Sequence, residues 1–218
     1  MSIRIITVER EYGSGGAAIA QALAKRLGWK LYDRELTTEI ARMANVDHRA
    51  AMRCDERVDN LLYRLFKVYA RGSYERSLPV GERAFDTDCM VETMHKVVED
   101  VASHGNSVIV GRGSAYFLRS REDAFHVFTY APVDEKVRRL KMIGKSEKEA
   151  LQLISEIDRE RASFIRHYFN AEWPNRSLYN LMINTKFGDE YVVDMVVQHI
   201  AAIDKLEASL SAPQSATA

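Results

Sequence analysis

Short apolar runs that alternate with helical patterns dominate this chain. Mostly apolar runs that predict strands lie at residues 3–8, 29–32, 107–110, 124–130 and 181–184. Amphipathic patterns that predict helices lie between or after them, at residues 17–27, 82–103, 146–169 and 191–206. Because short apolar strands alternate with helices, the chain is predicted to form an α/β fold with a parallel sheet covered on both faces.

Two segments depart from this alternation. Residues 33–80 are helical and strongly charged without a strand signal, so we interpret them as a helical insertion, with an apolar stripe from Leu61 to Tyr69. Residues 209–218 are small and polar and are predicted to be a disordered tail. We therefore expect one domain over residues 1–208, which includes a helical segment at 145–175 that Ser146 and Glu149 begin as a capping box.

Composition narrows the classes of function. The chain has 218 residues with 31 basic and 31 acidic side chains, which argues against a globally basic nucleic-acid binder. Its two cysteines, Cys54 and Cys89, are too few for a disulfide framework or a four-cysteine zinc site. No apolar run reaches the roughly 18 residues of a membrane span, and the N-terminus leads into a strand. We expect a cytoplasmic protein with no membrane partner.

A glycine-rich loop follows the first predicted strand. It places Gly13, Ser14, Gly15 and Gly16 after Arg10, directly before the first helix. Glycines there let backbone N–H groups turn inward around an anion, and the helix N-terminus adds its positive dipole. These five residues are the predicted phosphate-binding set; the alternative is an ordinary strand-to-helix turn.

The loop lacks the lysine of a standard phosphate loop. In the pattern G-x-x-x-x-G-K-[ST] the lysine reaches the β- and γ-phosphates and the hydroxyl binds Mg²⁺. Here Gly16 stands at the lysine position, and Ala17 and Ala18 follow it. Positive charge for a transferred phosphoryl group would therefore have to come from arginines elsewhere.

Three further positions offer polar groups at the predicted ligand edge. Arg112 follows the strand at 107–110, where its guanidinium is placed to bind a phosphate in a bidentate way; the alternative is a surface ion pair. Asp33 and Arg34 follow the second strand and are predicted to bind substrate. Asp33 suits a ribose hydroxyl or water-ligated Mg²⁺, and it suits equally the N-cap of the next helix.

The helix after Ser146 carries the last candidates: Asp158, Arg161 and Arg166. Residues 136–166 contain nine basic and five acidic residues, a net charge of +4 that suits a polyanion. One interpretation is a lid whose arginines close over phosphates and exclude water. The other is a solvated face with an Asp158–Arg161 ion pair.

The aromatic and histidine residues are weaker signals. Phe164, Tyr168, Phe169 and Trp173 suit base stacking, but at helical spacing they more often pack a lid or an oligomer contact. The six histidines are scattered and show neither metal-ligand nor triad spacing, so we expect no protein-bound metal.

Five stretches together resemble the cytidylate kinase-like family. They are REYGSGG (10–16), YDRE (32–35), VIVGRG (108–113), the DxxRA element (158–162) and YNLMINT (179–185), and their order spans nearly the whole chain. Two positions depart from the family pattern. Ala17 replaces the usual arginine of GG-R-E-I-A, and Asn180 replaces the aspartate of Y-D-L.

The resemblance implies a three-layer P-loop fold with a five-stranded parallel sheet, a nucleoside monophosphate-binding insertion at 33–80 and a lid at 145–175. It implies ATP-dependent phosphoryl transfer to a nucleotide such as CMP or dCMP, with Mg²⁺ as cofactor. Together with the positions described above, this predicts Arg112, Arg161 and Asp158 as the catalytic residues and Asp33, Arg34 and Arg166 as the substrate-binding residues.

Two other hypotheses remain at the level of sequence. The chain can be a non-catalytic nucleotide- or anion-binding protein with a degenerate loop, as the missing lysine suggests. It can also be an assembly protein that forms homo-oligomers through the helical insertion or the lid.

Overall fold

Five parallel strands form the centre of the molecule. The computed structural model describes residues 2–33 and 87–211. Its strands are β1 (Ile5–Arg10), β2 (Lys30–Tyr32), β3 (Ser107–Val110), β4 (Ala124–Tyr130) and β5 (Leu181–Asn184), in the order β2-β3-β1-β4-β5. Every pairing is parallel, as the sequence predicts, and the last three strands have the predicted bounds.

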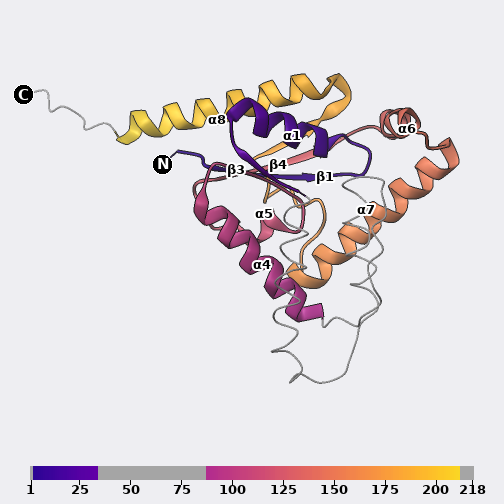
Figure 1. The fold of residues 1–218 in the computed structure, drawn as a ribbon, viewed down its shortest axis with the longest axis horizontal. Helices are drawn as coiled ribbons and strands as arrows, with labels where there is room; N and C mark the ends of the chain where they lie inside the picture. Colours follow the sequence, from indigo (N-terminus) through magenta and orange to yellow (C-terminus); the bar gives the residue numbers. More distant parts are fainter. Residues whose placement is uncertain (1, 34–86, 212–218) are drawn as a thin grey trace, which may run out of the picture.

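Helices cover both faces of this sheet (Figure 1). One face carries α1 (Gly16–Leu27) and α8 (Asp189–Ser211), whose apolar residues pack with alternate strand residues such as Ile6, Val8 and Val127. The other face carries α4 (Thr87–His104), α5 (Ser114–Phe117) and the end of α7 (Glu147–Phe169), which pack on Ile5 and Ile109. This burial on both faces explains why the strands read as continuous apolar runs.

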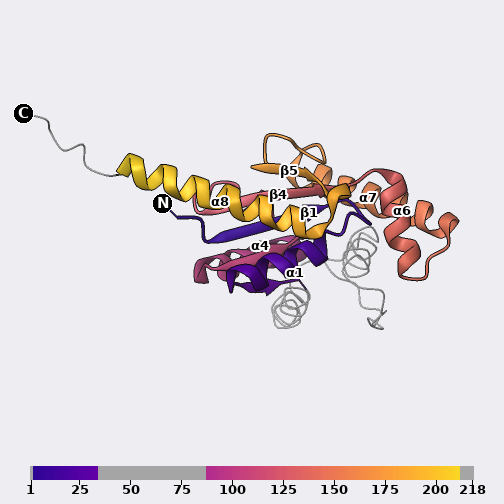
Figure 2. The same ribbon diagram turned by 90° about the horizontal axis from the view of Figure 1, so that it is seen from above.

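A helical hairpin extends beyond the end of the sheet (Figure 2). Helix α6 (Val133–Met142) leads into α7, and a small cluster of Tyr12, Leu140, Ile154 and Ile157 joins the hairpin to the glycine loop. The predicted N-cap of α7 is present, because the Ser146 hydroxyl accepts a hydrogen bond from the Glu149 amide at 3.2 Å. The hairpin therefore packs directly against the loop after β1.

Two helices have no counterpart in the sequence prediction, α5 and α6. Helix α5 is a single turn, too short to show a period. Helix α6 buries only Leu140 and the long side chain of Lys136, so its sequence resembles that of a charged, solvent-exposed segment. The short 3₁₀ helix η1 (Thr185–Phe187) follows β5 and was also not predicted.

Several sequence predictions fall outside the described residues. They are Arg34, almost all of the 33–80 insertion, the Leu61–Tyr69 stripe and most of the 209–218 tail. The extent of the single domain stays a prediction. Within the described residues, no helix has both the length and the apolar content needed to cross a membrane.

Candidate functional site

The glycine loop lies at the carboxyl edge of the sheet, between β1 and α1. Gly15 is the N-cap of α1, with φ +85°, and Gly13 has φ +80°, a backbone region that side chains other than glycine rarely adopt. The first amides of a helix have no partner within the helix and point toward a ligand. Helix α1 therefore directs its positive end to the crevice where a parallel sheet binds ligands.

Close packing explains the glycine at the usual lysine position. A Cβ atom on Gly16 would lie 2.6 Å from Arg10 Cβ and 2.7 Å from Thr129 Oγ1. A Cβ on Gly15 would overlap the Arg139 guanidinium. No side chain fits at either position without moving its neighbours, so the charge that the lysine normally supplies has to reach the loop from another element.

Hydroxyl groups fix the loop from three elements. The Ser14 hydroxyl donates to the Glu11 carbonyl at 2.8 Å and lies 3.1 Å from the Thr129 hydroxyl on β4. Thr185, after β5, donates to the Ser14 carbonyl at 2.8 Å. Ser14 is fully buried, so its hydroxyl shapes the loop, and a direct contact with phosphate would have to come from its backbone.

Asp158 and Arg161 attach helix α7 to the same loop. Asp158 accepts a hydrogen bond from the Tyr12 amide at 2.7 Å, and Arg161 donates to the Arg10 carbonyl at 2.6 Å. The two side chains are 3.4 Å apart, and Arg161 is 1% exposed. Burial raises the pKa of Asp158, while the charges of Arg161 and Lys136 and the Tyr12 N–H oppose that rise. The pair is thus both an intrahelical ion pair and a bridge to the loop.

Lys136 on α6 brings an ammonium group to this bridge. Its Nζ lies 2.6 Å from Glu11 Oε2 and 3.6 Å from Asp158 Oδ2, and the residue is 5% exposed. Its Cβ lies next to the Cα of Gly13, because a Cβ built on Gly13 would approach it to 3.1 Å. A buried lysine therefore stands beside a loop that has no lysine of its own.

Arg139, one turn further along α6, lies over Gly15. It donates to Asp189 Oδ1 at 2.7 Å and to the Thr185 carbonyl at 3.1 Å, and it also bonds to Glu135. These bonds hold its guanidinium against the N-terminus of α1. Sequence reasoning missed Lys136 and Arg139 as site residues because it assigned no helix to 133–142. The available signal was the K-x-x-R spacing that these two residues form after Pro132.

A buried carboxylate lies on the other side of the crevice. Glu9, 1% exposed, is the residue before the last one of β1. Burial raises its pKa, against the charges of Arg10, Arg161 and Arg112. Arg112 is also buried and adopts φ +63°, between two glycines with positive φ. A left-handed arginine costs about 1 kcal/mol or more, and such strain concentrates at functional sites. The backbone here directs an arginine into the protein instead of toward solvent.

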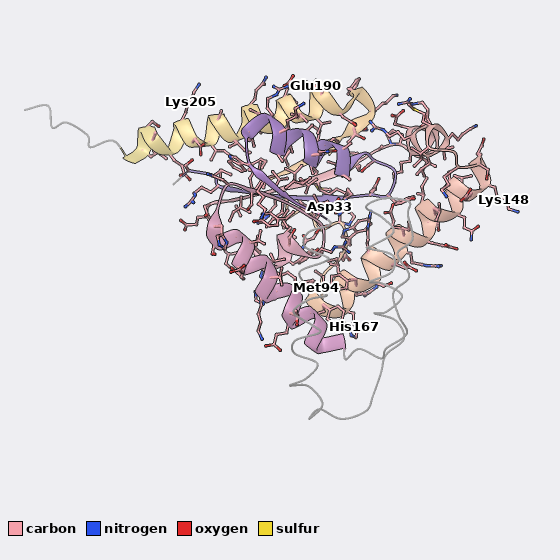
Figure 3. All side chains as sticks on the ribbon, in the orientation of Figure 1. Asp33, Met94, Lys148, His167, Glu190 and Lys205 are labelled. Atoms are coloured by element: carbon pink, nitrogen blue, oxygen red, sulfur yellow. The ribbon has the colours of Figure 1, made fainter. Side chains whose placement is uncertain are left out.

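The structure thus brings together most of the predicted site. The convergent residues lie at the carboxyl edge of β1 and β3; they are Arg10, the loop residues, Arg112, Asp158 and Arg161. Asp33, which Figure 3 labels, follows β2 at that edge. Arg166 is not placed with them. It lines a separate groove with Arg159 on the opposite flank of α7.

Two other sequence features have structural explanations. The Asn180 side chain accepts a hydrogen bond from the His126 amide at 2.7 Å, a bond that an aspartate carboxylate would also accept. Phe164, Phe169 and Trp173 pack on the α4–α5 core, and Phe164 is 1% exposed. These aromatics therefore serve packing within the chain. In the described part of the chain, no three His, Cys, Asp or Glu side chains gather to hold a metal.

Comparisons with known proteins agree with this geometry. The model of the cytidylate kinase-like family matches residues 5–186. A curated cytidylate kinase from Pseudomonas fluorescens (strain Pf0-1) is 24% identical, over 92% of this chain and 96% of its own length.

Solved structures share the fold. An uncharacterized protein from Eubacterium ventriosum ATCC 27560 has a TM-score of 0.65 and 24% identity, over 93% of this chain and 99% of its own. A gluconokinase from Sinorhizobium meliloti 1021 has a TM-score of 0.56 and 13% identity, over 95% and 97% of the two chains. A shikimate kinase from Bacteroides thetaiotaomicron has a TM-score of 0.51 and 16% identity, over 92% and 99%.

Proposed function

The chain belongs to the cytidylate kinase-like family, and from this premise we propose that it transfers the γ-phosphoryl group of ATP to a nucleoside monophosphate such as CMP or dCMP. The observation that carries the proposal is the position of α6. This helix lays Lys136 and Arg139 against Gly13 and Gly15, so two cations stand at a phosphate loop that lacks its own lysine.

Each group then has a definite task. Backbone amides of the loop and the N-terminus of α1 bind the donor phosphates, with Arg139 beside them. Arg112 and Arg161, with Arg10, form the positive wall on the acceptor side, and the buried Glu9 holds these guanidinium groups at the crevice. Asp158 and Arg161 attach α7 to the loop, so the lid hairpin and the phosphate site stay in register. Catalysis in this scheme is positioning plus charge neutralisation.

Mg²⁺ fits this site as part of the MgATP substrate. It prefers phosphate oxygens and water and needs only one or two protein carboxylates, and Asp33 is the carboxylate that directly follows β2 at this edge. The Ser14 hydroxyl donates to Glu11 and does not suit the metal. The ion would neutralise charge that develops on the β- and γ-phosphates, and the residues above do the rest.

A coupled ADP-release assay tests the proposal. MgATP is offered with CMP, dCMP, UMP, AMP, GMP or buffer, and we expect turnover that depends on the acceptor. Arg139→Gln should lower kcat/KM by about a hundredfold, since removal of one preorganised donor costs that much or more. Arg138→Gln is the matched control, because Arg138 bonds to Glu135 and not to the loop. No ADP above the buffer control with any acceptor would reject the proposal.

A second function has one observation in its favour. The basic groups around the loop already have partners within the protein: Lys136 bonds to Glu11, Arg139 to Asp189 and Arg161 to the Arg10 carbonyl. These bonds are complete without a nucleotide. A protein that binds a nucleotide or anion without transferring phosphate would show this arrangement. A thermal shift with ATP or CMP in the absence of turnover would favour it.

A further inference from the structure

A groove on the far flank of α7 carries three arginines. It has a volume of about 660 Å³ and lies between the second half of α7, the segment 170–176 and β5. Arg159 and Arg166 come from the helix, and Arg176 from the segment that follows it. The volume lies within the range of about 300–1,000 Å³ typical of sites for small ligands.

Helix geometry separates this groove from the phosphate loop. Arg161 and Arg159 are two positions apart on α7 and so point about 200° apart around its axis. Arg161 is buried against the loop, whereas Arg159 is exposed. Arg166 lies seven residues after Arg159, on the same flank, and the small residues Ala162 and Ser163 between them leave the space open.

The described residues do not neutralise the three guanidinium groups. Within the described residues, Arg159, Arg166 and Arg176 make no ion pair and no side-chain hydrogen bond. Other surface arginines make ion pairs: Arg26 pairs with Glu190 and Arg121 with Asp123. Glu172 is the single acidic residue in the groove, which leaves a formal charge of +2 there.

The rest of the lining suits the body of a ligand. Trp173, Pro174 and Met182 give one apolar wall, and Trp173 packs edge-on against Phe128. The Trp173 indole nitrogen is buried and has no hydrogen-bond acceptor among the described residues.

We propose that this groove is a second binding site, which takes a small phosphorylated molecule with a flat or apolar body. The phosphate binds the arginines, since guanidinium groups bind phosphate oxygens in a bidentate way, and the body lies against Trp173 and Pro174. The inference does not depend on the proposed kinase activity, because none of the phosphate-loop residues lines the groove.

The test is a titration with phenyl phosphate, which joins a phosphate to an aromatic ring. In a Trp29→Phe background Trp173 is the only tryptophan, so its fluorescence reports on the groove, and calorimetry gives the affinity. We expect saturable binding that weakens about tenfold in each of Arg159→Ala, Arg166→Ala and Arg176→Ala. Arg166→Lys should lose less, and Arg119→Ala, an exposed arginine outside the groove, should bind as the parent does. Inorganic phosphate should bind more weakly through the same residues, and phenol should not bind.

Three results would overturn the proposal. The first is the absence of saturable binding. The second is unchanged affinity in the arginine variants together with loss of binding in Gly15→Ala, which would assign the phosphate to the glycine loop. The third is binding of an RNA oligonucleotide or a phosphopeptide through these arginines when phenyl phosphate does not bind. Circular dichroism of the variants shows whether each is folded, and exposed substitutions should alter stability by less than about 0.5 kcal/mol.

Discussion

The two flanks of α7 use the same residue type in opposite ways. On one flank Arg161 is buried and bonds to the Arg10 carbonyl and Asp158, so its charge holds the glycine loop. On the other flank Arg159 and Arg166 are exposed and make no side-chain bond among the described residues. A buried guanidinium has to be paired because its desolvation is costly, whereas an exposed one is solvated by water and can bind a ligand. Charge alone therefore does not tell whether an arginine is already paired within the protein; burial and partners do.

The sharpest test of this contrast is to remove the two guanidinium groups separately. Arg161→Met keeps most of the apolar stem but removes the guanidinium donor from Asp158 and from the Arg10 carbonyl, so the free energy of unfolding should fall by about 3–5 kcal/mol. Arg159→Met should change it by less than about 0.5 kcal/mol. Urea unfolding at pH 7 measures both. Equal losses would show that burial does not divide the roles of the two flanks.

The next effect concerns the space over the glycine loop. Gly15→Ala and Gly28→Ala both place a side chain at positive φ, which costs about 1–2 kcal/mol in each. At Gly28 nothing lies within 4 Å, whereas at Gly15 the new methyl group meets Arg139. We expect about 1–3 kcal/mol of additional loss for Gly15→Ala from this overlap. Thermal unfolding compares the pair, and equal losses would mean that Arg139 moves freely away from the loop.

A smaller effect concerns His126 on β4, a buried histidine beside Thr7 that stays neutral in the folded protein. Burial lowers the pKa of His126 to about 4, and its Nδ1 lies 2.8 Å from the Thr7 hydroxyl. The unfolded chain takes up the proton near pH 6.5, so the stability from this group is present above that pH and lost as pH falls toward 4.

Between pH 7 and pH 5 the loss at His126 should be about 2 kcal/mol. Urea unfolding at both pH values measures it, and His126→Asn should remove this part of the pH dependence. His199→Gln changes an exposed histidine and serves as the control. A variant at His126 that keeps the full parental pH dependence would show that this histidine is not the source of the loss.

Periodicity was enough to predict the sheet but not the charges around it. Strands β3, β4 and β5 have the predicted bounds because burial on both faces leaves continuous apolar runs. The Ser146 cap was also predicted, because capping depends on two residues close in sequence. The glycine loop could be found for the same local reason.

The missed residues share a different physical cause. Lys136 and Arg139 act through contacts with Gly13 and Gly15, more than a hundred positions earlier in the chain, and no local pattern reports such a contact. Helix α6 is also mostly charged, so it resembles a solvated surface segment. Arg166 and Arg161 both looked like lid arginines because spacing gives the angle between two side chains but not which of them faces the sheet.

The smallest expected effect on stability comes from the N-cap of α7, which lies apart from both of its arginine-bearing flanks. Ser146→Ala removes the hydroxyl that accepts a hydrogen bond from the Glu149 amide, and the free energy of unfolding should fall by about 1 kcal/mol. Ser155→Ala, at an exposed position within the helix, is the control and should be close to neutral. Chemical unfolding measures the difference.

Asp158 and Arg161 lie more than three turns beyond Ser146 and are fixed by their own bonds to the loop. Loss of the cap should therefore fray the first turn without changing nucleotide or phenyl phosphate affinity. If either affinity falls in Ser146→Ala but not in Ser155→Ala, the hairpin of α6 and α7 transmits a change at its tip to the flanks, and the two flanks are not independent sites.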